Sequence, residues 1–128
     1  MVATALKLTK KTGDRKQFGW GMQGGGETNN FMAFFSTTIW GHGGEYFSGD
    51  GKTVTVNQPP AVAGVTTWSD LLLKHKVVQD SVLQDDGNTI LPLFAQEVVA
   101  QYLTGTYAIA PIRKANPNID IGFGVWPR

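Results

Sequence analysis

The sequence contains no cysteine. A disulfide framework and a thiolate zinc site are therefore excluded, and the redox compartment stays open. The sequence also lacks an excess of charge of one sign, because it has 11 Lys and Arg and 10 Asp and Glu. No net positive field attracts nucleic acid, so we expect no such partner. No apolar run approaches the roughly 20 residues of a membrane span. The first residues also lack the basic stretch and apolar run of a signal peptide, so neither segment is expected within the chain.

Patterns that carry catalysis or bind metal are equally scarce. His42 and His75 are the only two histidines, and neither has a partner at a metal-ligand spacing. The serines follow no nucleophile-elbow pattern, and the glycine run 24–26 matches neither the dinucleotide fingerprint nor the phosphate-binding loop. Most carboxylates stand in turns or at helix starts, where they accept backbone hydrogen bonds. The sequence therefore predicts no metal site, no cofactor and no enzyme.

What is present indicates one folded domain. The 128 residues are 41% hydrophobic and include 16 Gly, which suits a single domain with a moderate core. Apolar residues recur at helical spacing or alternate as in strands. Helices are predicted over 3–11, 29–40 and 60–76, with shorter ones after Gly87 and Gly105; strands over 18–22, 98–103 and 119–126; and a hairpin turn at Asp50-Gly51. Helices alternating with strands predict an α/β domain with one mixed sheet and flanking helices.

Two places in this pattern suit a bound ligand. Glu27 follows the glycine run beside a predicted helix N-terminus, which can receive polar groups of a ligand, although capping the helix is an equally good role. Tyr107 follows Gly105 and Thr106 directly after a predicted strand, at the edge where α/β sheets bind ligands. A ring with a hydroxyl suits the apolar face of a sugar.

A set of ordered motifs resembles one known family. The stretches "GGEYFSGDGKTVTVNQPPAVAGVTTWSDLLLKHKVV" and "DDGNTILPLFAQEVVAQYLTGTYAIAPIRKANPNIDIGFGVWP" resemble the carbohydrate-class extracellular solute-binding proteins of ABC importers, the group that includes maltose-binding protein. That family has a Gly-Gly pair before a "DGK" hairpin, an Asn-x-Pro helix start, and an "F-x-x-G-x-x-A-M" strand that leads to "G-P-W". The corresponding positions here are 43–44, 50–52, 57–60, 94–101 and 105–107. The chain departs from the pattern at Glu97 for Gly, at Gln101 for Met, and at Thr106-Tyr107 for Pro-Trp.

The resemblance implies a fold and a role. The chain is similar to the second, C-terminal-type lobe of the type II periplasmic binding protein fold, with residues 1–128 forming one lobe and the first lobe absent. In that family two lobes joined by crossover strands hold a sugar between them and deliver it to a membrane permease. The resemblance therefore implies non-enzymatic binding of a sugar or oligosaccharide, an ABC importer permease as partner, and a periplasmic or extracellular location.

The resemblance also implies which residues touch the sugar. Tyr107 stands where the family often has a Trp that stacks on a sugar, and Gly105 and Thr106 complete that turn. Residues 27–31 fall in a loop that leads into a helix and often supplies ligand contacts. The set implied is Tyr107, Gly105, Thr106, Glu27, Asn29, Asn30, Phe31 and Trp40, with Asn29 and Asn30 as hydrogen-bond partners for hydroxyls and Trp40 equally compatible with the core.

Two other hypotheses stay open at this point. In the first, the chain is a lone-lobe structural or protein-interaction module with no ligand of its own, which forms a homodimer through its exposed cleft face. In the second, it is a small glycan-processing enzyme that uses Glu27, and loss of turnover in Glu27→Gln would be needed to support it.

Overall fold

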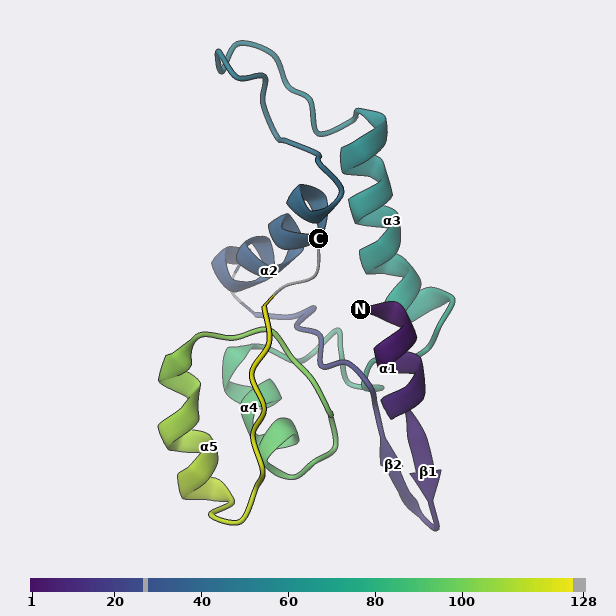
Figure 1. The fold of residues 1–128 in the computed structure, drawn as a ribbon, viewed down its shortest axis with the longest axis vertical. Coiled ribbons are helices and arrows are strands. Elements are labelled where there is room, and N and C mark those ends of the chain that lie inside the picture. Colours follow the sequence, from purple (N-terminus) through teal and green to yellow (C-terminus); the bar gives the residue numbers. More distant parts are fainter. Residues whose placement is uncertain (27, 126–128) are drawn as a thin grey trace.

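The computed structural model describes residues 1–26 and 28–125, and for 28–31 and 33 it describes the backbone alone (Figure 1). The elements along the chain are helix α1 (Val2–Leu8), strands β1 (Lys10–Thr12) and β2 (Arg15–Gln17), helices α2 (Thr28–Gly41), α3 (Pro59–Leu73) and α4 (Gly87–Ala95), the 3-10 turn η1 (Thr106–Ala108) and helix α5 (Ile109–Ala115). Among the described residues, no helix combines the length and apolarity needed to cross a bilayer.

Three short extended segments form the centre of the molecule. Residues 18–21 lie between residues 77–78 on one side and 98–102 on the other, and every pairing is parallel. The backbone hydrogen bonds are Trp20 N to Val77 O (3.0 Å), Phe18 N to Val98 O (2.8 Å), Ala100 N to Phe18 O (2.8 Å) and Gly21 N to Gln101 O (2.6 Å). The only regular ladder among the described residues is the antiparallel hairpin of β1 and β2. The predicted mixed α/β architecture is therefore present, with its central layer reduced to single pairings.

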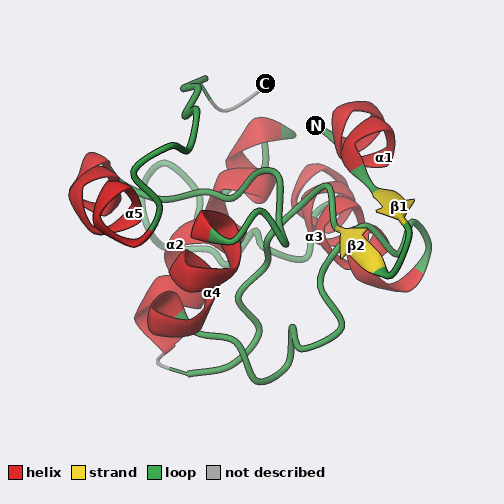
Figure 2. Ribbon diagram, turned by 90° about the horizontal axis from the view of Figure 1, so that it is seen from below, coloured by secondary structure: helices red, strands yellow, loops and turns green. Residues whose placement is uncertain are grey.

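Helices flank this centre on two sides, and each side has its own core. Helices α1 and α3 lie together with the β1–β2 hairpin, while α4 and α5 lie on the opposite side of the molecule (Figures 1 and 2). The first side buries a cluster that includes Ala5, Trp20, Trp68 and Leu71. The second side buries two clusters around Ile90, Val99, Ala108 and Ile112. The central segments thus contribute to the cores on both sides.

Helices α2 and α3 pack closely because α3 carries a glycine at the contact. A Cβ built on Gly64 would lie 2.6 Å from Ile39 Cα and 2.7 Å from Thr38 O. Ile39 and Gly64 are both buried, so the two helix backbones approach with no side chain between them. Phe35 then meets Trp68 edge to face, with ring centroids 6.3 Å apart. The prediction of these two helices from the helical spacing of their apolar residues is confirmed.

The hairpin predicted at Asp50-Gly51 projects beyond α2 and α3 (Figure 1). Its strands pair at Phe47 and Val54. The Asp50 carboxylate accepts hydrogen bonds from Ser48 Oγ (2.5 Å) and Lys52 N (3.2 Å), and Gly51 adopts a φ of +70° that glycine tolerates best. Asp50 therefore has the structural role in the turn that its sequence context predicts.

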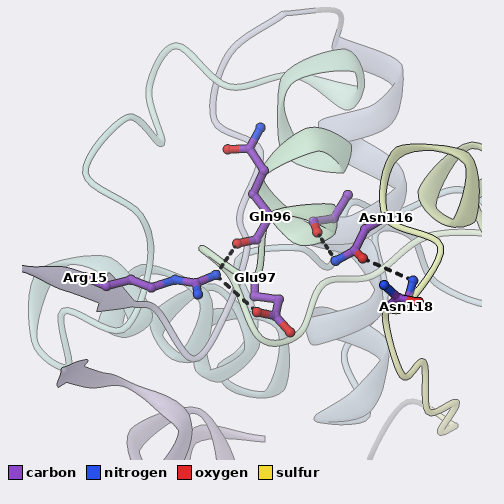
Figure 3. A network of polar contacts seen from close by, with 6 residues as sticks. Arg15, Gln96, Glu97, Asn116 and Asn118 are labelled. Atoms are coloured by element: carbon purple, nitrogen blue, oxygen red, sulfur yellow. Dashed lines mark hydrogen bonds and ion pairs between the residues drawn. The ribbon is translucent and has the colours of Figure 1, made fainter.

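Helix α4 is fixed at both ends by polar contacts. At its start, Asp86 Oδ1 accepts hydrogen bonds from the backbone N–H groups of Asn88 (2.8 Å) and Thr89 (2.9 Å), which completes a capping box. At its end, Arg15 donates to Gln96 O (2.6 Å) and pairs with Glu97 (3.1 Å) (Figure 3). Asn116 holds the same turn from the other side by donating to the carbonyl oxygen of residue 95 (2.9 Å).

Three segments differ from the prediction. Helix α3 ends at Leu73, not at residue 76, and the chain then runs into residues 77–78 of the centre. Helix α1 ends at Leu8, not at residue 11, because Thr9 adopts extended backbone angles (φ −76°, ψ 113°) and Lys10 then begins β1. The strand predicted over 119–126 forms no ladder in its described part, residues 119–125. Trp126 lies outside the described residues.

Candidate functional site

The order of the central segments defines a switch point. Along the chain, residues 18–21 come first, 77–78 second and 98–102 third, but in space the first segment lies between the other two. The connection through α2 and α3 therefore leads to one side of the first segment, and the connection through α4 leads to the other. In open parallel sheets, ligands bind beyond the carboxyl ends of the two strands at which this reversal occurs. Here those strands are residues 18–21 and 98–102. The place beyond these two ends, between residues 22–26 and residues 103–107, is called the switch-point crevice from here on.

The two segments that leave this edge carry site residues that the sequence predicts. Residues 22–26 leave the first segment and lead to α2. Residues 103–105 leave the third segment and lead into η1, which contains Thr106 and Tyr107. Because Gly21 pairs with Tyr102 in parallel, both segments leave the edge in the same direction. The fold thus brings Gly105, Thr106 and Tyr107 to the same edge as the glycine run.

Tyr107 presents an exposed ring at this edge. Its side chain is 74% exposed, although it belongs to the apolar stretch that leads into α5. A Cβ built on Gly105 would lie 2.5 Å from Tyr107 Cε1 and 2.7 Å from Cδ1, so the ring rests against the backbone of Gly105. The φ of Gly105 is −89°, which any residue can adopt. Gly105 therefore makes room for the ring and does not serve a special backbone conformation.

The glycine run serves close packing of two loops. A Cβ on Gly24 would lie 2.7 Å from Val82 O, and one on Gly25 would lie 2.9 Å from Leu83 O. Gly26 has a φ of +76°, and a Cβ there would lie 2.5 Å from Asp86 Cβ. The run thus lies directly on the loop that precedes α4, and this contact fixes the wall of the crevice.

A buried amide holds the same wall. Gln79 is 1% exposed; its Oε1 accepts from Met22 N (3.1 Å), and its Nε2 donates to Met22 O and to Asp85 Oδ2 (2.9 Å). Ser81 Oγ donates to the same Asp85 oxygen (2.6 Å). The carboxylate of Asp85 is therefore part of the scaffold, as its sequence context predicts, and it orders the loop under the glycine run.

Gln23 is a candidate that the sequence patterns do not reveal. It lies two residues after the central segment, is only 6% exposed, and its Oε1 has no hydrogen-bond partner among the described residues. A buried carbonyl without a partner costs free energy, so such a group marks a place where a ligand or water is needed. A glutamine beside three glycines carries no motif, and only the fold shows that it is buried at this edge.

The other predicted residues have different placements. Glu27 lies outside the described residues. Asn29, Asn30 and Phe31 lie in the first turn of α2, which starts at this edge, but the structure describes only their backbone. Trp40 is 52% exposed and stands near the far end of α2, roughly 18 Å along the helix at 1.5 Å per residue. The fold does not bring Trp40 to the crevice, and its role in binding stays a prediction.

A groove of about 660 Å³ adjoins the crevice. It lies between α1, residues 100–106 and residues 120–125, and therefore includes Gly105 and Thr106. Burial raises the pKa of the Tyr102 hydroxyl in this groove above its usual value, because desolvation disfavours the phenolate. No group of three or more His, Asp or Glu that could hold a metal ion occurs in the described part of the chain.

Comparison with solved structures supports this interpretation of the fold. An ABC transporter solute-binding protein from Thermotoga lettingae TMO, bound to alpha-D-tagatose, superposes with a TM-score of 0.77 at 23% identity, over 91% of this chain and 29% of that one. The maltose-bound T. maritima MalE3 superposes with a TM-score of 0.67 at 24% identity, over 75% of this chain and 24% of that one. The chain therefore spans less than a third of either relative.

Sequence comparison gives the family. No curated protein matches the chain. The sequence model of one family, described as bacterial extracellular solute-binding protein, matches residues 1–128. Since that match extends over the whole chain and the fold agrees with two solved members of the same kind, the chain belongs to the bacterial extracellular solute-binding proteins.

Proposed function

We propose that this chain is the second lobe of a sugar-binding protein of an ABC importer, and that the switch-point crevice holds one face of the sugar. The observation that carries the proposal is the ring of Tyr107, 74% exposed and supported by Gly105 beside that crevice. An exposed aromatic ring backed by main chain is a rigid surface for stacking. The two solved relatives, which hold tagatose and maltose, support a carbohydrate as the ligand class.

The surrounding groups suit a neutral polyol. A sugar ring stacked on Tyr107 presents hydroxyls at its rim, and the unpartnered Oε1 of Gln23 is an acceptor for one of them. The N-terminus of α2 offers backbone donors. The family resemblance assigns Asn29 and Asn30, in the first turn of that helix, as further hydrogen-bond partners. Stacking worth about 0.5–1.5 kcal/mol corresponds to a change in Kd of roughly two- to twelvefold.

The proposal includes the context of the lobe. A pocket for a small molecule normally buries 70% or more of its ligand, so about half a cleft should bind a sugar weakly. We infer that a first lobe covers the opposite face of the sugar in the intact protein, which delivers the sugar to a permease from the periplasm or the cell exterior. Binding without turnover is the expected activity, which the family of the chain supports.

Titration with a panel of mono- and oligosaccharides, followed by intrinsic tryptophan and tyrosine fluorescence, tests the proposal. A saturable response is expected for at least one sugar, with binding weakened roughly two- to twelvefold in Tyr107→Ala. Phe47→Ala is the matched control, because Phe47 is also exposed (58%) but lies on the projecting hairpin. Equal weakening in both variants, or no response from the folded protein to any sugar, would refute the proposal.

A further inference from the structure

Two aspartates in the chain are followed by glycine, Asp50 and Asp86. An Asp-Gly bond is chemically labile, because glycine has no side chain to keep its amide nitrogen away from the aspartate carboxyl. The nitrogen attacks that carboxyl when the chain is free to bend, and a cyclic succinimide forms. Both sites contain the same dipeptide, so the fold around each one decides which of them reacts.

The closed hairpin turn engages both reacting groups at Asp50. The nucleophile, Gly51 N, donates a hydrogen bond to Ser48 O (2.8 Å). The carboxylate accepts hydrogen bonds from Ser48 Oγ (2.5 Å) and from Lys52 N (3.2 Å). These two hydrogen bonds, that from Ser48 first, lower the pKa of the Asp50 carboxyl, so its reactive neutral form is scarce in the closed turn. Reaction at Asp50 therefore requires the turn to open.

Opening this turn breaks few contacts. The hairpin projects beyond α2 and α3 (Figure 1). Among the described residues, the hydrogen bonds of residues 48–53 all have their partners within the same segment. The hairpin strands pair at Phe47 and Val54, whose side chains are both 58% exposed. A segment with exposed hydrogen bonds and little buried apolar surface opens at a low cost in free energy.

The second Asp-Gly bond is built into the start of α4. Asp86 caps this helix, and directly before it Gly25 N donates to Asp85 O (2.9 Å). A Cβ built on Gly26 would lie 2.5 Å from Asp86 Cβ, so the glycine run lies against the site. Ile90, one turn further along the helix, is 1% exposed. Freeing Asp86 to react therefore requires the release of buried contacts.

We propose that Asp50 is a site of spontaneous isoaspartate formation in the folded protein, and that the fold protects Asp86 from the same reaction. In the opened turn, Gly51 N bonds to Asp50 Cγ, and the hydroxyl of the acid leaves as water with the amide proton. Water then adds to the main-chain carbonyl carbon of Asp50 and breaks its bond to Gly51 N. The chain now runs through Cβ and Cγ of residue 50, and the former main-chain carbonyl is a free carboxylate.

Ageing the folded protein for weeks in heavy-oxygen water at neutral pH compares the two sites. Each succinimide that opens takes up one heavy oxygen, and trypsin separates the sites because it cleaves after Lys52 and Lys76. Mass spectrometry should show label entering the Asp50 peptide about tenfold or more faster than the Asp86 peptide. Chromatography should resolve an isoaspartate form of the first peptide. Equal labelling rates, or faster labelling at Asp86, would overturn the proposal.

Denaturation is the control for the dipeptide chemistry. In guanidinium chloride neither the hairpin turn nor the cap of α4 exists, so the two peptides should take up label at similar rates. A preference for Asp50 that persists unchanged in the unfolded chain would show that neighbouring sequence sets the order of reaction. That result would refute protection of Asp86 by the fold.

A variant of the turn tests the opening step. Ser48→Ala removes a donor to the Asp50 carboxylate and the acceptor for Thr53 N (3.0 Å). Labelling at Asp50 should therefore accelerate roughly two- to twelvefold, while labelling at the other site stays unchanged. Ser69→Ala is the matched control, because that hydroxyl donates to Thr66 O on α3. Equal rates at Asp50 in the two variants would contradict control of the reaction by the turn.

Discussion

Glu97 stands in a backbone conformation that favours glycine. Its φ is +59°, in the left-handed region, at the turn between α4 and the third central segment. For a residue with a Cβ this conformation costs about 1 kcal/mol or slightly more. Its compensating contact is the ion pair with Arg15 (Figure 3), but the two side chains are 56% and 61% exposed, which limits the pair to about 0.5 kcal/mol or less.

The structure therefore predicts that Glu97→Gly stabilises the protein by about 0.5–1 kcal/mol despite the loss of the ion pair. Glu97→Ala loses the same ion pair but keeps the strain, so it should be slightly destabilising. The two variants should differ by about 1 kcal/mol, or about 4 °C in Tm. The hydrogen bond from Arg15 to Gln96 O remains in both.

Urea unfolding followed by circular dichroism, with thermal melts in parallel, measures this difference. The comparison between the glycine and alanine variants isolates backbone strain, because neither has the ion pair. Equal stability of the two variants would refute the assignment of strain. A glycine variant less stable than the unmodified protein would show that the ion pair outweighs it.

Three further perturbations test the scaffold of the crevice. Gly64→Ala should destabilise the protein by about 2 kcal/mol in urea unfolding, because its Cβ would meet the backbone of α2 at 2.6 Å. Gln79→Leu should cost about 3 kcal/mol, since the Met22 amide loses its acceptor and the buried Asp85 carboxylate loses one of its two donors, keeping only Ser81. Asp86 is the third: the N–H groups of Thr89 and Asn88 lower the pKa of its carboxyl, so its contribution is complete above pH 3.8 and is lost as pH falls through the lower folded-state pKa. The pH dependence of stability below pH 3.8 should therefore be weaker in Asp86→Asn.

Controls distinguish these effects from general sensitivity. Gly49→Ala places a Cβ in open space and Gln84→Leu changes an exposed side chain, so each should alter stability by about 0.5 kcal/mol or less. A Gly64→Ala variant as stable as Gly49→Ala would contradict the close packing of α2 on α3. A Gln79→Leu variant no worse than Gln84→Leu would contradict the buried network. If the stability of Asp86→Asn fell with pH below 3.8 as steeply as that of the unmodified protein, the result would contradict the capping assignment.

Local signals made part of this structure predictable. Asp50-Gly51 specifies its turn within four residues, and the helical spacing around Trp68 specifies α3. The family pattern also marked position 97, where the usual Gly matches the positive φ that Glu97 adopts. The solute-binding family and the α/β fold follow from such signals and are confirmed.

Features that depend on contacts between distant segments were not predictable. The burial of Gln23 and the Gln79–Asp85 contact arise only when the loop before α4 lies on the glycine run. The alternation in residues 119–125 predicts a strand, but a strand needs a neighbour, which pattern alone cannot supply. The ligand residues themselves stay predictions. Tyr107 follows the third central segment, as the sequence predicts.

Mapping where a sugar binds on the 128-residue chain would test the switch-point crevice itself. Amide chemical shifts would be recorded by NMR as the sugar with the strongest fluorescence response is added to saturation. We expect the largest changes on residues 22–26, 28–31 and 103–107, on both sides of the switch point. Changes confined to the hairpin around Phe47, or spread over the surface without saturation, would contradict binding at the crevice.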